Sequence, residues 1–417
     1  MREIDKPDLK KTILLLGASA DQLFAIRTAK KMGLRTLVVD MNPSSPGFME
    51  ADDYAVISTR DVPALIKFID DYIAKGEDIC GVLVMGSDIP QVVCALAEHI
   101  GTPHIPMEAA ILSTHKFKMK RRFREFDIPI PWFSHVESVE QLKKNIIEKG
   151  YPLVLKPVDR SGARGVFYIQ ESSNLEALFV QSQNYSFSGE VMVEEFLSGL
   201  QISTESIMYK GKAYTPGFAD RNYEKLEEYA PNIIENGAWV PSCLSTKEKK
   251  AVESLVEKAA LALGVTNGVV KGDVVLTSEG PKMIEMATRL SGGDFSESLI
   301  PLGSGINIVE AAINIALGCE PDLDKLYPSF QKWVVNRYFF PPPGRLINVV
   351  GEKKVREQSW VKKLEFWYKP GDIIPPIKSH ADRFGVFIVV GNSREEVENR
   401  ASWVYENIKI NIDTTHQ

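Results

Sequence analysis

One stretch of the chain, VVKGDVVLTSEGPKMIEMATRLSGG (Val269–Gly293), restricts the possible folds more than any other. Valines alternate with charged residues up to Thr277, Ser278–Pro281 are turn formers, and the alternation resumes over Lys282–Arg289. Such alternation is typical of strands, and a short turn between two strands predicts an antiparallel hairpin.

Because side chains alternate across a strand, each strand presents one polar face. The residues expected to share a face are Lys271, Asp273, Val275 and Thr277 on the first strand, and Met283, Glu285, Ala287 and Arg289 on the second. An odd loop such as Ser278–Lys282 makes Asp273 and Glu285 diagonal neighbours, about 7–8 Å apart at Cα, whereas an even loop separates them. We favour the odd loop, because it collects two carboxylates, one arginine and one lysine on a single face.

Two carboxylates on neighbouring strands repel one another unless a cation lies between them. No His or Cys lies in this stretch, and hard oxygen ligands indicate Mg²⁺, which is usually shared with substrate phosphates. The alternative is an exposed hairpin with solvated charges. Ser291-Gly292-Gly293 favours the metal site, because glycine permits the close approach of another backbone.

The composition is that of a soluble globular protein, with 44% hydrophobic and 25% charged residues. A length of 417 residues predicts two or three domains. The net charge of −6 offers no basic surface for nucleic acid or an anionic membrane, so neither partner is expected.

The cysteines lie far apart and form no C-x-x-C pair, which argues against a structural zinc site and a disulfide framework. They are Cys80, Cys94, Cys243 and Cys319. The start of the chain, MREIDKPDLKK, lacks the apolar core of a signal peptide. No apolar run reaches the roughly 18 residues of a membrane span, so we expect a cytoplasmic protein.

Strands and helices alternate over the first hundred residues, which predicts a parallel doubly wound sheet. Gly17 and Asp40 follow the first two strands and raise the alternative of an NAD site. The loop GASADQ has one glycine where the dinucleotide fingerprint needs three, so we favour a Rossmann-like layer without cofactor. Gly86-Ser87-Asp88 follows another strand end and is a candidate for substrate contact.

Three features of the central region suit a nucleotide. A basic helix, predicted to be capped by Ser113-Thr114, runs over Lys116–Arg124, and most of its charges are expected in solvent. The loop DRSGARGV after Lys156 can surround anionic oxygens with backbone N–H groups, or it is a tight turn with exposed arginines. Glu194 ends a strand where it can accept a hydrogen bond from the exocyclic amine of a base.

Three segments together resemble the ATP-grasp superfamily, namely KPVDRSGARGV (Lys156–Val166), VEEFLSGLQIS (Val193–Ser203) and the hairpin GDVVLTSEGPKMIEMATRLSGG. They are similar to its glycine-rich lid, its adenine-binding hinge and its metal-binding hairpin, in the same order and spacing. THKFKMKRRFREFDIPIP (Thr114–Pro131) resembles the helix whose lysine contacts phosphate.

The resemblance implies an α/β protein with the ATP-grasp fold, in three parts. These are an N-terminal Rossmann-like parallel-sheet domain (residues 1–110), the ATP-grasp domain (111–318) and a small C-terminal β-rich domain (319–417) that completes the active site. The last part looks like the C-terminal domain of biotin carboxylase-type members. The overall layout and the string ATRLSGG look most like carboxylate–amine ligases such as the L-amino acid (dipeptide) ligases.

The resemblance also implies roles for individual residues. The ATP-binding residues are Lys116 and Lys156 at the phosphates, Ser161, Gly162, Arg164 and Gly165 in the lid, and Glu194, Phe196 and Leu197 at adenine. Asp273 and Glu285 are the implied metal ligands, and Arg289 the residue that stabilises the transferred phosphoryl group. Lys271 joins Arg289 as a catalytic candidate, because strand parity puts it beside Asp273.

Two positions depart from the family pattern. Gln201 stands where a ribose-binding glutamate is usual, and Ala287 stands where an asparagine ligand is usual, which leaves the number of metal ions open. Further along the chain, Arg221-Asn222-Tyr223 belongs either to the acceptor site or to a surface loop. Arg383 lies either in a turn or in the active site.

The implied function is an ADP-forming ligase that uses ATP and Mg²⁺, or Mn²⁺, to join a small-molecule carboxylate to an amine through an acyl phosphate. Family habit implies a homodimer. The alternatives are a formate- or bicarbonate-activating relative, and a catalytically silent ATP-binding module, which Gln201 and Ala287 keep open. An NAD-dependent dehydrogenase rests only on Gly17 and Asp40. The substrates themselves are not readable, because acceptor pockets are built from variable loops.

Overall fold

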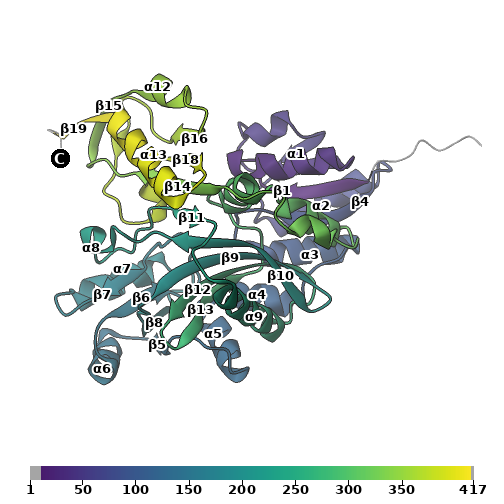
Figure 1. The fold of residues 1–417 in the computed structure, drawn as a ribbon. Coiled ribbons are helices and arrows are strands. Elements are labelled where there is room, and N and C mark those ends of the chain that lie inside the picture. Colours follow the sequence, from purple (N-terminus) through teal and green to yellow (C-terminus); the bar gives the residue numbers. More distant parts are fainter. Residues whose placement is uncertain (1–10, 415–417) are drawn as a thin grey trace, which may run out of the picture.

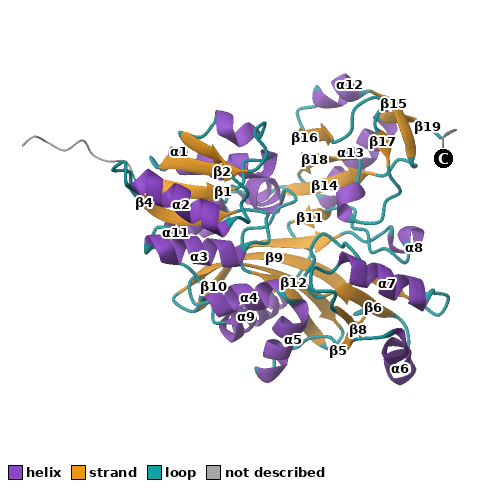
Figure 2. Cartoon of the chain, turned by 180° about the vertical axis from the view of Figure 1, so that it is seen from behind, coloured by secondary structure: helices purple, strands orange, loops and turns teal. Residues whose placement is uncertain are grey.

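The computed structural model describes residues 11–414, so residues 1–10, for which no signal peptide is predicted, and 415–417 lie outside it. The described residues form four sheets with helices packed against them. Figure 1 shows the N-terminal and C-terminal parts side by side above a long central sheet, and Figure 2 shows the same arrangement from behind. Among the described helices none is long and apolar enough to cross a membrane.

The N-terminal sheet is parallel and doubly wound, as predicted. In spatial order its strands are β3 (Asp53–Val56), β2 (Arg35–Asp40), β1 (Thr12–Leu16) and β4 (Ile79–Val84). One face packs against α2 (Val62–Ile73) and α3 (Pro90–Ile100), and the other against α1 (Leu23–Lys31) and α11 (Ile308–Ala316). The chain therefore returns from beyond residue 300 to cover its own N-terminal sheet.

A second, antiparallel sheet carries the lid loop. Its order is β5 (Phe133–Val136), β8 (Val191–Glu195), β6 (Leu153–Pro157) and β7 (Phe167–Ile169). Helices α6 (Val139–Lys149) and α7 (Leu175–Tyr185) bury the apolar side chains of one face. Lys156 and Glu194 stand on neighbouring strands. Because side chains alternate, both lie on the other face of this sheet, away from these helices.

The central sheet is long and antiparallel, and it continues into the C-terminal part. Its order is β13 (Gly280–Ala287), β12 (Gly268–Thr277), β9 (Leu200–Tyr209), β10 (Lys212–Arg221), β11 (Ala238–Val240), β14 (Trp333–Phe339), β18 (Gly385–Gly391) and β16 (Val361–Phe366). Helices α4 (Met107–Thr114), α5 (Lys116–Glu125) and α9 (Thr246–Leu263) cover one face of its first strands. The other face is left for polar side chains.

The C-terminal part is small and β-rich with one long helix, as predicted. Helix α13 (Arg394–Asn407) packs on β14 and β18 over a core that includes Phe387 and Val404. A short sheet of β17 (Ile373–Ile374), β15 (Gly344–Val350) and β19 (Lys409–Asp413), with α12 (Glu352–Arg356), closes the chain. The domain boundaries at residues 110 and 318 stay a prediction.

The predicted hairpin is present as β12 and β13, but the prediction of an odd loop is wrong. Thr277 pairs with Gly280, which leaves a loop of two residues, Ser278 and Glu279. A two-residue loop alone would send Glu285 to the face opposite that of Asp273. A β-bulge reverses this outcome, because the register shifts by one residue at Ile284.

The bulge brings Asp273 and Glu285 directly opposite one another, not diagonally. Ile284 and Glu285 consequently lie on the same side, toward the cavity described below. Met283 is fully buried on the other side, in the core under α9, so the prediction that it shares a face with Glu285 is wrong. One extra residue in β13 thus produces the predicted acidic pair by a different route.

The expected close approach at Ser291-Gly292-Gly293 is present. The Gly86 N–H donates to the carbonyl of Leu290 at 3.1 Å, and a Cβ on Gly292 would lie 3.1 Å from Gly86 Cα. This contact joins the end of β4 to the end of the hairpin. It brings the loop that carries Asp88 beside Arg289.

We predict that Gly292→Ala destabilises the protein by about 1–3 kcal/mol, the usual cost of overpacking. The added methyl group should push Gly86 away, so the Gly86 amide should also exchange faster with deuterium, and urea unfolding with hydrogen exchange measures both effects. Gly280→Ala is the control. Gly280 has φ +116°, so alanine strains the backbone there, but the added methyl group meets no neighbour within 4 Å. Unchanged protection of Gly86 in Gly292→Ala would contradict the packing described.

Candidate active site

The candidate active site is a cavity of about 530 Å³. Its walls come from the N-terminal sheet (Asp88), from α5, from the lid and hinge, from the polar face of the central sheet, and from the C-terminal part (His380). Its described lining includes eight Lys or Arg and six Asp or Glu side chains. An excess of cations around paired acids suits a polyanion such as a nucleotide phosphate.

A buried cluster of one acid and two lysines lies where β6, β8 and α5 meet at the cavity. Glu194 accepts a hydrogen bond from Lys156 Nζ at 2.5 Å, and Lys120 Nζ lies 2.9 Å from its other oxygen. Burial opposes ionisation of Glu194, but the two lysines outweigh it and hold its pKa below the usual value. Burial also lowers the pKa of Lys120 to about 8, against the attraction of Glu194.

Lys120 is a site residue that the sequence analysis missed, because most charges of this helix were expected in solvent. It is fully buried, does not line the cavity and acts through Glu194. The available signal was spacing, since Lys120 lies four residues after Lys116, on the same helix face. The predicted cap is also wrong, because Ser113 and Thr114 end α4 and the His115 side chain accepts from the Lys118 N–H.

The predicted lid is a loop that contains residues in the left-handed backbone region, with φ +68° at Gly162 and +70° at Gly165. Ser161, Gly162 and Arg164 line the cavity, as expected of a lid. Gly165 does not line it, and a Cβ there would lie 2.9 Å from Tyr185. Gly165 therefore serves packing beneath the lid in this structure.

The two residues just before the lid, Asp159 and Arg160, are held in place. Lys116 Nζ donates to the carbonyl of Arg160 at 2.7 Å. Asp159 accepts hydrogen bonds from the backbone N–H groups of Phe187 and Ser188. Lys116 thus contacts the backbone at the start of the lid. Opposite the lid, the predicted hinge residues Phe196 and Leu197 line the cavity, as does Gln201.

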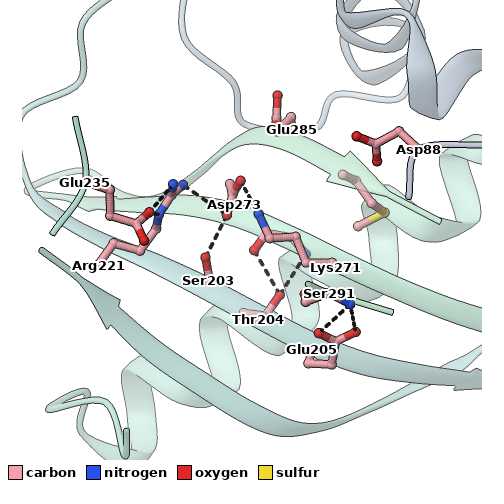
Figure 3. Close-up of polar contacts among 12 residues, drawn as sticks. Asp88, Ser203, Thr204, Glu205, Arg221, Glu235, Lys271, Asp273, Glu285 and Ser291 are labelled. Atoms are coloured by element: carbon pink, nitrogen blue, oxygen red, sulfur yellow. Dashed lines mark hydrogen bonds and ion pairs between the residues drawn. The ribbon is translucent and has the colours of Figure 1, made fainter. Parts of the chain in front are cut away.

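The two acids of the hairpin are compensated by cations from different elements, and Figure 3 shows the contacts of Asp273. Asp273 pairs with Lys271, lies 3.3 Å from Arg221 and accepts a hydrogen bond from Ser203 Oγ at 2.8 Å. Glu285 Oε2 lies 3.3 Å from Lys116 Nζ. Burial opposes ionisation of Glu285, yet nearby lysines, Lys116 above all, hold its pKa well below the usual range.

Two residues of the segment Arg221-Asn222-Tyr223 face the cavity, and a part in an acceptor site stays a prediction. Arg221 and Tyr223 line the cavity, and Arg221 pairs with both Asp273 and Glu235. Burial opposes the charge of Arg221, but the two acids outweigh it and raise its pKa. Arg221 is therefore a charged group of the site.

Arg289 reaches from the hairpin to the N-terminal part. Its Nε donates to Asp88 Oδ1 at 2.7 Å, and Asp88 is the one residue of the candidate Gly86-Ser87-Asp88 that lines the cavity. Burial opposes the charge of Arg289, whereas Asp88 raises its pKa. Its position between two parts of the chain places a fixed positive charge at their junction.

Glu205 supports the loop that follows Arg289. Its buried carboxylate accepts from the Ser291 N–H at 3.2 Å and from Ser296 Oγ at 2.9 Å (Figure 3 shows the Ser291 contact). Burial raises the pKa of Glu205 to about 7, against the effect of these hydrogen bonds and of Arg289. The group therefore titrates near neutral pH.

We predict a specific pH dependence of stability from Glu205. Between about pH 4.5 and 7 the folded state keeps a proton that the unfolded state loses, so this group makes stability fall as pH rises, by at most about 1.4 kcal/mol per unit. Glu205→Gln removes this dependence. The free energy of unfolding of the variant, relative to that of the wild type, should therefore rise up to pH 7 and then level off. Urea unfolding at several pH values measures this, and a constant difference would contradict the assignment.

The sequence analysis also missed His380, which begins a short helix (His380–Asp382) of the C-terminal part and lines the cavity. The neighbouring Arg383, considered as an active-site residue, does not line it. Arg383 lies over the Tyr338 ring, 3.5 Å from its centre, and donates to the carbonyls of His380 and Glu235. Its role is to hold the segment that carries His380.

The donor set fits a hard divalent cation that is shared with a phosphate. Asp273 and Glu285 are directly opposite one another in the hairpin and offer only oxygen ligands. Within residues 11–414 no group of three or more His, Cys, Asp or Glu side chains is arranged to hold a metal by itself. Phosphate oxygens and water would complete the coordination, as is usual for Mg²⁺.

Comparisons with known proteins agree with the fold and the cavity. Residues 113–293 match the family model of the ATP-grasp domain, and residues 337–413 match that of the L-amino acid ligase C-terminal domain 2. Together the two matches cover more than half of the chain. The chain therefore carries an ATP-grasp domain, which confirms the predicted resemblance to the ATP-grasp superfamily and the predicted fold class.

Individual relatives extend the similarity over nearly the whole chain. The phosphoribosylamine–glycine ligase of Methanococcus maripaludis is 24% identical, over 95% of this chain and 94% of its own. The L-amino acid ligase of Bacillus licheniformis has a TM-score of 0.82 at 18% identity, covering 97% and 99%. The biotin carboxylase of Campylobacter jejuni has a TM-score of 0.71 at 20% identity, covering 96% and 92%. The protein is thus an ATP-dependent ligase of this superfamily.

Proposed function

We propose that this ligase transfers the γ-phosphoryl group of ATP to a substrate carboxylate and that an amine then displaces phosphate from the acyl phosphate. The products are an amide or peptide bond, ADP and phosphate. One observation carries the proposal: cations from three separate elements, Lys116, Lys156 and Arg289, line one cavity with the opposed acids Asp273 and Glu285.

This arrangement supports the reaction, because phosphoryl transfer depends on positioning and charge neutralisation more than on a side-chain nucleophile. Lys116 and Lys156 would hold the phosphates, and Arg289 would offset the charge on the transferred group. The lid, residues 161–165, would exclude the water that hydrolyses an acyl phosphate. Lys271 keeps Asp273 compensated until the ligand arrives.

The base and the metal have separate places in the proposal. Adenine would lie against Phe196 and Leu197, with its exocyclic amine donating to Glu194. Asp273 and Glu285 would bind Mg²⁺, or Mn²⁺ in its place. A bound cation there would offset the negative charge of the phosphates.

Amino acids are the substrate class that we favour for both the carboxylate and the amine. The match of residues 337–413 to an L-amino acid ligase domain supports this choice. The second candidate is a reaction of the phosphoribosylamine–glycine ligase type, which is supported by a relative of nearly equal length.

The test is phosphate release with ATP, Mg²⁺ and pooled amino acids, with each pool omitted in turn. We expect release that needs both a carboxylate and an amine, with ADP as a product. Release only with glycine and phosphoribosylamine would favour the second candidate. ATP binding without release in any pool, including formate and bicarbonate, would favour a catalytically silent module.

We predict that Asp273→Asn and Glu285→Gln each lower Mg²⁺-dependent turnover by at least about 100-fold, because each removes a charged metal ligand. Steady-state phosphate release over a Mg²⁺ titration measures the loss. Glu279→Gln is the matched control, since Glu279 is an exposed acid in the turn of the same hairpin. Normal turnover in either site variant would remove the metal assignment.

A further inference from the structure

His380 lies in the C-terminal part, yet it makes two contacts with residues far away in the sequence. Its ring accepts a hydrogen bond, at 3.3 Å from the Glu235 N–H to Nε2, across 145 residues of sequence. Its own backbone N–H donates to the carbonyl of Gly162 in the lid at 3.2 Å. One residue therefore connects the C-terminal part to the lid and to the segment that holds Glu235.

The contact with Glu235 decides where the proton of the ring lies. A backbone N–H can only donate, so Nε2 must be the acceptor, and a neutral imidazole then carries its proton on Nδ1. Among residues 11–414 no side-chain or backbone acceptor is bonded to Nδ1. His380 lines the cavity, and an unbonded Nδ1–H there can donate to a bound ligand.

The surroundings keep the ring neutral. Burial lowers the pKa of His380 well below the usual value, and the neighbouring cations Arg383, Arg221 and Lys271 lower it further, with Asp273 opposing them. The carboxylate of Glu235 is itself paired with Arg221. Protonation of the ring near neutral pH would also break the hydrogen bond from Glu235.

We propose that His380 is a ligand-binding residue of this site, whose neutral Nδ1–H donates a hydrogen bond to an anionic oxygen of the bound substrate. The oxygen belongs to a phosphate of ATP or to the substrate carboxylate, which offer the same acceptor chemistry. The inference rests on the proposed ligase function and adds a residue to it. A neutral donor suits this place, because it adds no charge to a site already rich in cations.

Two substitutions separate donation to the ligand from the structural contact. His380→Asn retains an amide N–H near the position of Nδ1 and loses the acceptor for Glu235. His380→Gln retains an acceptor near Nε2 and loses the donor to the cavity. Both keep the backbone N–H that bonds Gly162, so the contact with the lid is matched between them.

We expect His380→Gln to lose about 100-fold in kcat/KM and His380→Asn to stay within about fivefold of the wild type. Weaker ATP binding in His380→Gln, measured by calorimetry, assigns the bond to a phosphate. A raised KM for the carboxylate with unchanged ATP binding assigns it to the substrate. A loss confined to His380→Asn, equal losses in both variants, or no loss in either would overturn the proposal.

A second measurement needs no turnover. In ¹⁵N-labelled protein the His380 ring should show a protonated Nδ1 and an unprotonated Nε2 between pH 6 and 8. Addition of MgATP, or of inorganic pyrophosphate as a probe, should shift the Nδ1 signal if a phosphate is the acceptor. A doubly protonated ring, or the opposite tautomer, would overturn the inference whether or not the ligase reaction proves correct.

Discussion

The pairing of Asp273 with Glu285 is the constraint on which the site depends. Two like charges placed directly opposite each other on neighbouring strands destabilise a sheet unless they are compensated. The compensation comes from Lys271 in the same hairpin, Arg221 in β10 and Lys116 in α5. Removing one partner of a buried pair typically costs about 3–5 kcal/mol, so these cations hold the site together before any ligand arrives.

One of these cations, Lys116, is also among those that would meet a nucleotide, together with Lys156 and Arg289. Each is already out of bulk water and paired with an acid, so a phosphate would exchange one anionic partner for another. Binding would then require little new desolvation of the cations, which is the usual penalty for a buried ion pair. Structural stability and ligand binding thus share Lys116.

Much of this could be predicted from the sequence, because the motifs are local. The hairpin acids, the lid and the parallel N-terminal sheet follow from alternation and turn residues in short segments. The loop parity could not be predicted, because the bulge at Ile284 depends on how Met283 packs under α9. Tertiary packing overrode the simple count of residues in the turn.

Residues brought in from far along the chain were harder to foresee. Lys120 stands in a strongly basic helix, and only its spacing from Lys116 distinguishes it from solvated neighbours. His380 lies in a segment with no motif, and its role depends on contacts with Glu235 and Gly162 that no local pattern encodes.

The continuity of the central sheet also limits how the chain can be divided. β11 pairs with β14, and β14 with β18, so the backbone hydrogen bonding of the central part extends into the last hundred residues (Figure 1). A cut between the two parts would leave β11 and β14 as bare strand edges, which attract other chains and promote aggregation. An exchange of C-terminal segments between relatives would therefore have to preserve this strand register as well as the side chains of the cavity.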